Sequence, residues 1–591
     1  MLFKNELHFC DELTKRVHIF TKNNKKIGEG ELVIASGRLS KVEVDHEVRL
    51  SDYQKNGYFL CKSNDLTVTL LGCDILDSHI YPRIIVKGKK EDARFKELSI
   101  VLQGVSDWMD NAHSGEITKS GFHQPRETET FDISVKDHRG REFFIASEHW
   151  CSLGKQQGSH YLIEQYTVFN LVMKTGFFSL DDVIEKAGEM RTIFSLLLGF
   201  PLSVEYVMDT GNKRRRSIYF ANQSQTKQPF ESKIYCIADS RYIHDAKLWE
   251  SIFKNFYQNK PDIFKNLWSR LVGNLENTGF WEHKILSYVS LVDRYVSIYA
   301  AEHDENLPRG KFRALRNAAL SALSGTKDEN SNEVFQAVVT SMEKQIETTR
   351  NSKFSSFRDC FDFTLSEMSN DIKDIIALKK EDFGHLKKIR DHVAHGKVPE
   401  TKDGKDITYE VTLQSKLSVL LLYWAYRDFG FSDKDFAGFL DKRFNPILMR
   451  ARLDEEAIDR VNHDYPCLNV TRPDFKKIKN TIYVDTILKY NQKSGNYHLC
   501  EHYSLQSKKW LVDPKERKKI RSIEYYIASI LGKDECQTII YISKAYVQNR
   551  GETHKVQTGL CILNPPEDLI TDDISFKKIR YDESQEKWVD A

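Results

Sequence analysis

Short runs of apolar and β-branched residues, separated by turn residues, fill the chain from residue 31 to about residue 150. Runs of this length and composition are typical of β-strands. They lie at residues 31–35, 66–71, 84–86, 98–102 and 131–135. The pattern predicts a β-rich N-terminal region, folded as a β-sandwich or a curled sheet.

More strand-like sequence follows residue 161, and the apolar period then changes to that of a helix. Ser179, in Ser179-Leu-Asp-Asp182, can cap this helix, because a serine side chain accepts hydrogen bonds from the first free backbone N–H groups. Gly199-Phe-Pro201 follows Leu198, and proline cannot continue a helix. We therefore expect a helix that Ser179 caps and that ends at Leu198.

Six later segments show the apolar spacing of helices, at residues 283–301, 310–324, 331–350, 356–369, 383–395 and 412–429. They predict an all-α region of the bundle type. Beyond Asn445, strand-like segments at 481–484, 538–542 and 559–563 accompany a helical segment at 522–531. This mixture predicts a separate, small α+β region.

Together the patterns predict an α+β multidomain protein, as expected for a chain of 591 residues. We expect a β-rich domain at residues 1–150 and a mixed α/β continuation at residues 151–275. A helical domain at residues 276–445 and a small α+β domain at residues 446–591 complete the prediction.

Composition narrows the class of protein only slightly. Hydrophobic residues make up 40% of the chain, which argues against general disorder, and the net charge of +2 means that any basic surface must be local. The N-terminus has early charges and no sustained apolar run, so we expect no secretory signal, no membrane span and a cytoplasmic location. The ten cysteines form no Cys-x-x-Cys pair, which argues against a zinc ribbon.

The segment 383–395 carries the most informative polar residues of the chain. Phe383, Leu386, Ile389 and Val393 give it one apolar stripe, and Gly396 can end the helix. Around the stripe lie groups suited to an RNA phosphodiester, namely Lys387, Lys388, Arg390, Asp391, His392, His395 and Lys397. This is also the only place where His follows Arg after four to six residues.

Cutting RNA without a metal ion requires a group that takes the 2′-hydroxyl proton, a cation beside the phosphate oxygens and a proton for the leaving oxygen. Histidine can carry the protons near neutral pH, and arginine can hold the phosphate. Asp391 could fix the tautomer of His395, since the two residues are four apart. Arg390 and His395, however, lie about 140° apart around a regular helix. A loosened last turn or two facing copies would bring them together, and we favour the dimer.

An α-helical domain with Arg390 and His395 at this spacing resembles the HEPN superfamily of ribonucleases. The preceding β-rich region, with Gly30-Glu-Leu-Val-Ile34, residues 98–102 and Ser179-Leu-Asp-Asp182, resembles ApeA-type bacterial anti-phage proteins. The resemblance covers about residues 25–441 and leaves the last 150 or so residues unexplained.

The resemblance implies a homodimer with a composite site that cuts host translation RNA, such as tRNA, after infection by a phage. The products would be a 2′,3′-cyclic phosphate and a 5′-hydroxyl. It implies that Arg390 and His395 are catalytic and that Asp391 supports them. The surrounding RNA-binding residues would be Lys387, Lys388, His392 and Lys397. No cofactor is implied, and a phage component could be the trigger.

Three other interpretations stay open. The polar cluster could be a solvated helix end with an Arg390–Asp391 pair. The domain could bind RNA or protein without cutting, or the chain could be the sensor component of a toxin–antitoxin pair. The basic run at Lys213-Arg-Arg-Arg216 and the segment Lys508-Lys-Trp510 could contact phosphate, but we interpret both as solvated surface.

Metal-ligating atoms gather in the C-terminal region, at His463, Cys467, His498, Cys500 and His502. Alternation along a strand would place His498, Cys500 and His502 on one face. The spacing matches no zinc motif, so we predict no metal. We also find no phosphate-binding loop, dinucleotide fingerprint or serine-hydrolase elbow.

Overall fold

A computed structural model shows two compact units, Met1–Leu453 and Asp454–Ala591, which are described separately below. It describes the chain except for residues 1–5, 46–52, 54–56, 110–115, 119–120, 124–129, 156–160, 212–214, 223–226, 228, 259–262, 277–278, 305–307, 329–331, 350–351, 355, 398–400, 403, 405, 442–443, 464, 482, 484, 521, 532–535, 551, 557–558, 567–568, 570–575 and 591.

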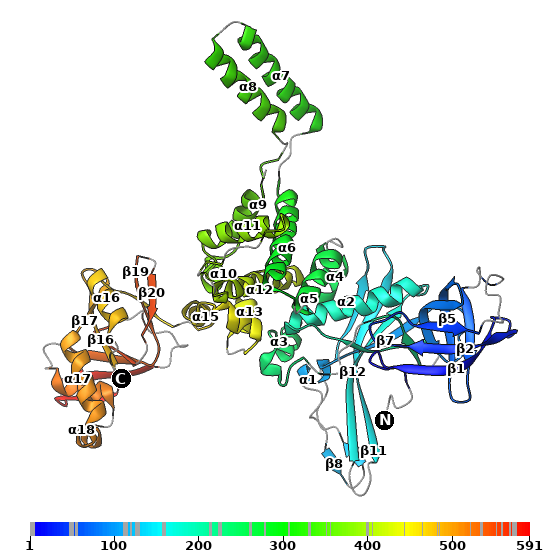
Figure 1. Cartoon of the computed structure of the whole chain (residues 1–591). Coiled ribbons are helices and arrows are strands. Elements are labelled where there is room, and N and C mark those ends of the chain that lie inside the picture. The colour runs from blue at the N-terminus through cyan, green and yellow to red at the C-terminus, as the bar shows by residue number, and fades with distance from the viewer. Residues whose placement is uncertain are drawn as a thin grey trace. The chain divides into compact units, whose positions relative to one another are not determined.

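A twelve-stranded sheet, antiparallel throughout, dominates the N-terminal part of the first unit (Figure 1). Its strand order is β10-β11-β12-β7-β13-β14-β6-β3-β2-β1-β4-β5. The strands are β1 (Leu13–Phe20), β2 (Lys26–Ile34), β3 (Lys41–Val44), β4 (Tyr58–Lys62), β5 (Thr67–Leu76), β6 (His79–Lys87), β7 (Glu97–Leu102), β10 (Asp132–Lys136), β11 (Glu142–Lys155), β12 (Tyr161–Met173), β13 (Val204–Asp209) and β14 (Arg216–Tyr219). A separate two-stranded pair joins β8 (Glu116–Thr118) to β9 (Gly121–His123).

The first six strands close into a ring, because β5 pairs with β6 as well as with β4. The β5–β6 ladder runs from Val68 opposite Lys87 to Leu76 opposite His79. Of the two predicted architectures, the curled sheet is therefore the one observed. Apolar side chains such as Val17, Leu32 and Val42 are almost fully buried, as the alternation along the strands requires.

The helix that Ser179 was expected to cap is α2 (Leu180–Leu198), and its cap is confirmed. The Ser179 hydroxyl accepts a hydrogen bond from the Asp182 backbone, and Gly199 ends the helix with a φ of 72°. Helix α1 (Val105–Trp108) precedes α2 in the chain. The short helices that follow α2 are η3 (Lys233–Tyr235), α3 (Ser240–Asp245), α4 (Trp249–Gln258), η4 (Ile263–Trp268) and α5 (Ser269–Glu276).

All six helices predicted for the central region are present, with slightly different ends. They are α6 (Trp281–Glu302), α7 (Arg309–Asp328), α8 (Glu333–Thr348), α9 (Phe357–Ser366), α11 (Lys380–Ala394) and α12 (Thr408–Phe429). The structure adds α10 (Asn370–Ile376), α13 (Asp433–Leu440), α14 (Pro446–Ala451) and α15 (Glu455–Asn462), of which α15 belongs to the second unit. Helices α7 and α8 lie side by side as a hairpin (Figure 1).

Helix α12 is the most buried element of the helical region, because apolar residues cover nearly its whole circumference from Leu417 to Tyr426. Its Tyr426 hydroxyl donates a hydrogen bond to the backbone oxygen of Leu197 in α2, at 2.7 Å. The β-rich and helical regions thus share one packed unit. The boundaries predicted at residues 150 and 275, within this unit, stay predictions.

The second unit is α+β. Its six-stranded sheet has the order β17-β16-β21-β18-β22-β23, and a three-stranded sheet has the order β15-β19-β20. The strands are β15 (Cys467–Asn469), β16 (Asp485–Asn491), β17 (Asn496–Leu499), β18 (Thr538–Ile542), β19 (Tyr546–Asn549), β20 (Glu552–Lys555), β21 (Gly559–Leu563), β22 (Phe576–Asp582) and β23 (Lys587–Asp590). Besides α15, the helices are α16 (Arg472–Asn480), α17 (Glu501–Val512), α18 (Pro514–Lys519) and α19 (Ile523–Ile530).

The observed order of a β-rich region, a helical region and a C-terminal α+β unit agrees with the predicted fold class. Within the described residues, no helix combines the length and the apolar character that crossing a membrane requires.

Candidate functional site

Helix α11 presents the candidate residues, and its sequence explains where it begins and ends. The Asp382 carboxylate accepts a hydrogen bond from the Lys379 backbone N–H at 2.8 Å, which caps the first turn. Phe383, Leu386 and Ile389 are buried, as the apolar stripe predicts. Lys387 and Lys388, between Leu386 and Ile389, are therefore left exposed.

The last turn of α11 closes as a Schellman motif. The backbone N–H of Gly396 donates to the Val393 oxygen at 3.0 Å, and that of Lys397 donates to the His392 oxygen at 2.9 Å. Gly396 adopts a φ of 68°, which glycine tolerates without strain. His395 is the residue that leaves the helix, and its side chain is exposed beside the carbonyl end.

Arg390 is held on the opposite side, against two other helices. Its Nε and Nη2 donate to Oδ1 of Asp391 at 3.1 and 3.0 Å. Its Nη1 lies 3.9 Å from Oδ2 of Asp293 in α6, and the guanidinium lies 5.4 Å from the ring centre of Phe357 in α9. The Arg390 side chain is 26% exposed, so part of it can still contact a ligand.

Among the residues that the structure describes, no hydrogen bond or ion pair joins Arg390 or Asp391 to the His395 side chain. The expected Asp391–His395 contact is thus replaced by an Asp391–Arg390 contact. The physical reason is that the Arg390 guanidinium offers two donors to the same carboxylate oxygen.

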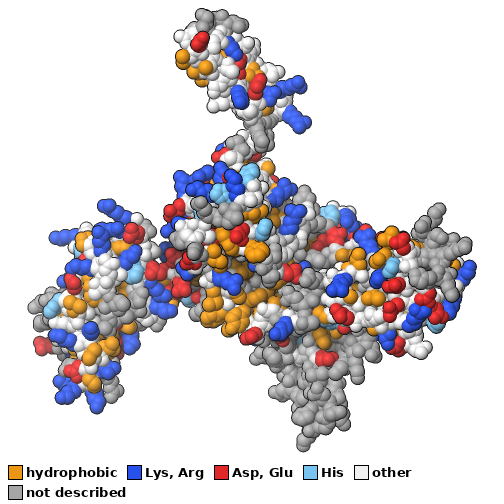
Figure 2. All heavy atoms as spheres, viewed as in Figure 1, with side chains coloured by type: hydrophobic (Ala, Val, Ile, Leu, Met, Phe, Trp, Pro, Cys, Tyr) orange, Lys and Arg blue, Asp and Glu red, His pale blue; other side chains and the backbone are white. Residues whose placement is uncertain are grey.

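The proposed RNA-binding residues are accessible. Lys387, Lys388 and Lys397 are exposed, while His392 is half-buried. Figure 2 shows Lys, Arg and His side chains gathered over the part of the helical region that contains α9 and α11. A chain near neutral charge therefore carries a local cationic surface here, of the kind that attracts phosphate.

Sequence reasoning did not find the pair formed by His385 and Glu410. Glu410 in α12 is fully buried, and its Oε1 lies 2.9 Å from Nε2 of His385 and accepts the backbone N–H of Lys402 at 2.8 Å. Next to it, burial and a hydrogen bond to Asp382 raise the pKa of Tyr409. The only signal in the sequence was an acidic residue, Glu410, in the first turn of α12. The predicted helix began at residue 412, after Glu410.

The metal-ligating residues of the C-terminal unit do not share one strand face. β17 ends at Leu499, Cys500 directly precedes α17 and His502 lies within that helix, so the expected alternation was wrong. His498 lies 3.5 Å from the Asp474 carboxylate instead. In the described parts of the chain, no three His, Cys, Asp or Glu side chains form a group that could hold a metal ion.

The structure also describes parts of the two segments that could contact phosphate, Lys213–Arg216 and Lys508–Trp510. Lys213 and Arg214 lie outside the described residues, while the guanidinium of Arg215 lies 3.9 Å from the ring centre of Trp150. Trp510 donates its Nε1–H to the Ile520 oxygen at 2.8 Å and packs against the core of its unit. Its ring is therefore partly covered by that core.

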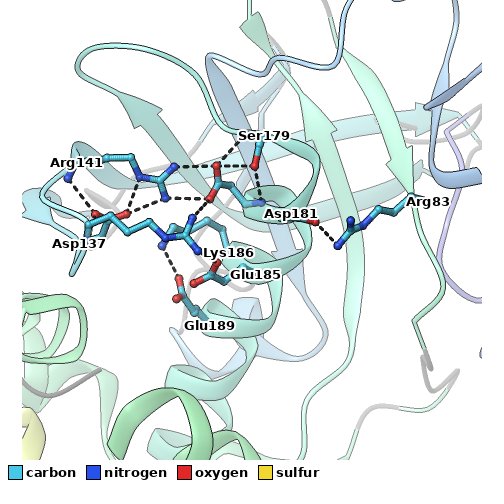
Figure 3. Close-up of polar contacts among 10 residues, drawn as sticks. Arg83, Asp137, Arg141, Ser179, Asp181, Glu185, Lys186 and Glu189 are labelled. Carbon is cyan, nitrogen blue, oxygen red and sulfur yellow. Dashed lines mark hydrogen bonds and ion pairs between the residues drawn. The ribbon is translucent and has the colours of Figure 1, made fainter. Parts of the chain in front are cut away.

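The start of α2 holds a network of charges, drawn in Figure 3. Arg141 donates from Nη1 and Nη2 to the two oxygens of the buried Asp182, at 2.8 and 2.9 Å, and its Nε donates to Asp137 at 3.0 Å. Burial alone would raise the pKa of Asp182, but hydrogen bonds from Arg141 and Ser179 outweigh it and hold that pKa far below its ordinary value. This network joins α2 to the turn between β10 and β11.

The comparisons with known proteins bear on this N-terminal part. Residues 20–235 match the family model of ApeA N-terminal domain 1. No curated protein and no solved structure matches the chain significantly. The matched segment includes the Ser179–Asp182 turn and most of the twelve-stranded sheet, and it ends before the helical region. This match supports an ApeA-type anti-phage protein, with a role in defence against phages.

Proposed function

We propose that the chain is an anti-phage effector that cuts RNA without a metal ion, through a HEPN-type site on α11. The observation that carries the proposal is the end of α11, where an exposed His395 and three exposed lysines adjoin a partly exposed Arg390. The ApeA-type domain that precedes it supplies the link to defence.

In the proposed reaction, the ribose 2′-oxygen attacks phosphorus while the bond from phosphorus to the 5′-oxygen breaks. His395 accepts the 2′-hydroxyl proton and becomes imidazolium. The imidazolium then gives a proton to the departing 5′-oxygen. Arg390 neutralises the charge that grows on the phosphate oxygens. The products are a 2′,3′-cyclic phosphate and a 5′-hydroxyl.

The proposed site is composite, because Arg390 faces α6 and α9 whereas His395 leaves the free end of α11. Two copies of α11 facing each other would let Arg390 of one copy and His395 of the other meet one phosphate. Asp391 acts as a positioning residue that fixes the Arg390 fork. The RNA backbone is bound by Lys387, Lys388, His392 and Lys397. The simplest RNA with which to measure this binding is tRNA, a host translation RNA.

The test is to incubate the purified protein with total cellular RNA in excess EDTA, with and without phage lysate, and to analyse the fragment ends. Wild type should leave cyclic phosphate ends, and His395→Ala should leave the RNA intact. His502→Ala, which removes an exposed histidine of the other unit, is the matched control and should cut normally. Intact RNA under every condition would contradict the proposal.

A second candidate is an RNA- or protein-binding module without catalysis. It is favoured by the contacts of Arg390 with Asp391 and Asp293, which occupy part of the guanidinium. In that case His395→Ala should leave binding unchanged, while removal of Lys387 and Lys388 should weaken it. A sensor in a toxin–antitoxin pair would instead show no toxicity when expressed alone.

A further inference from the structure

The C-terminal unit contains a hollow of about 1000 Å³ at one edge of its six-stranded sheet. The β16–β17 hairpin contributes Lys489, Tyr490 and His498 to its wall, and Lys493 lies in the turn between these strands. Lys578 of β22 completes the cationic lining. The volume lies at the upper end of the range of small-molecule sites.

In open α/β sheets, ligands commonly bind beyond the carboxyl ends of parallel strands, and the described part of this mostly antiparallel sheet has one parallel pair. β16 and β21 are adjacent and parallel, and both end at this edge. β18 runs antiparallel to β21 and begins at the same edge. Loops at such an edge can diverge and leave a crevice.

The charged side chains in the lining have one sign, and an acid beside the wall, Asp474, has its carboxylate 3.5 Å from His498. Among the described residues that line it, three are lysines and none is Asp or Glu. No described carboxylate forms an ion pair with Lys489, Lys493 or Lys578, whereas the neighbouring Lys577 lies 3.7 Å from Glu524. Like charges gathered in a concave surface repel one another, and a bound anion relieves that repulsion.

The remaining lining suits a planar, polar group beside the anion. Tyr490 is half-buried in the lining, and its ring lies 5.0 Å from that of Tyr497. At the rim, Oδ1 of Asn564 accepts the backbone N–H groups of Gln537 and Thr538, at 2.9 and 3.2 Å. An aromatic face with lysines around it is a recurrent platform for a base and its phosphates.

We propose that this hollow binds the phosphate and base of a nucleotide, either free or within a single-stranded RNA. The site gives His498 a role as a wall residue of an anion site. The inference does not depend on the ribonuclease activity proposed for α11, which lies in the other unit.

The experiment uses the full chain carrying His395→Ala, so that RNA is not cut. Binding of a labelled single-stranded RNA is followed by fluorescence anisotropy, and binding of ATP by calorimetry. The test variant adds Lys489→Glu and Lys578→Glu. The control adds Lys508→Glu and Lys509→Glu on α17, which changes the charge of the same unit by the same amount.

We expect the test variant to bind at least one probe about tenfold more weakly, and the control to bind as the parent does. Loss of ATP binding would identify a free nucleotide as the ligand, and loss of RNA binding alone would identify a strand. Equal binding by the test variant and the parent, or loss only in the control, would overturn the proposal. Circular dichroism of each variant checks that it has folded.

Discussion

Asp391 accepts two hydrogen bonds from the guanidinium of Arg390, at 3.1 and 3.0 Å, so these sequence neighbours form one unit on α11. The carboxylate therefore sets the direction of the arginine. This assigns to Asp391 a different task from the orientation of His395 that the four-residue spacing indicates.

Replacing Asp391 by Asn should lower the rate of RNA cleavage about tenfold or more, because a misdirected guanidinium stabilises the transition state less well. The KM for RNA should change little. Single-turnover kinetics with the variant measures both effects. Asp362→Asn, which removes the acid of another arginine pair in the helical region, should leave the rate unchanged.

Replacing Lys387 and Lys388 together by Gln should weaken RNA binding without removing the chemistry. The slope of log affinity against log salt should fall by about 1.4, since each lost phosphate contact on a single strand accounts for about 0.7. Titrations of labelled RNA at several salt concentrations test this. An unchanged slope would show that these exposed lysines do not touch the backbone.

Replacing Arg141 by Ala should destabilise the first unit by about 3 kcal/mol at pH 7, because the buried Asp182 loses its bidentate partner. The pKa of Asp182 is lowered by folding, so its contribution to stability is present above its unfolded pKa and is lost as pH falls through the folded one. The difference between wild type and variant should therefore shrink in acid. Urea unfolding at pH 7 and at about pH 2.5, which lies below the unfolded pKa of an aspartate, measures it.

Arg83→Ala is the matched control for that experiment, since it removes an exposed pair with Asp181 near the same helix start (Figure 3). An exposed pair contributes about 0–1 kcal/mol, so the urea midpoint should hardly move. Equal losses of unfolding free energy in both variants would show that the Arg141 network contributes no more to stability than an exposed ion pair does.

Replacing Asp485 by Asn should stabilise the C-terminal unit above pH 6. Burial and, second, the charge of Glu524 raise the pKa of Asp485 to about 6. Because folding raises this acid's pKa, ionisation opposes folding, and stability falls as pH rises from the unfolded pKa through the folded one. Removing that charge should gain roughly 3 kcal/mol at pH 7 and far less at pH 4. Urea unfolding detects this, with Glu583→Gln on the exposed β22–β23 turn as control.

Local signals predicted much of the fold. The Ser179 cap, the Gly396 stop and the ends of most central helices depend on residues within one turn, which sequence displays directly. The strand-rich start was equally visible, because alternation is a local property. These features need no knowledge of which segments meet.

What escaped prediction depends on contacts between distant segments. His385 and Glu410 are 25 residues apart, and nothing in either helix alone indicates their pairing. The place of Arg390 against Asp293 and Phe357 is likewise set by packing of three helices. The change from strand to helix at Cys500 reversed the expected faces, since no capping side chain marked it.

The ring of six strands has a consequence for dissecting the protein. β1 sits between β2 and β4, yet the family match begins at residue 20, the last residue of β1. A fragment cut at the matched boundary would lose that strand and expose two bare backbone edges, which readily pair with other chains. The segment that matches the family model is thus shorter than the segment that forms the strand ring, and truncations meant to keep the ring whole should begin before Leu13.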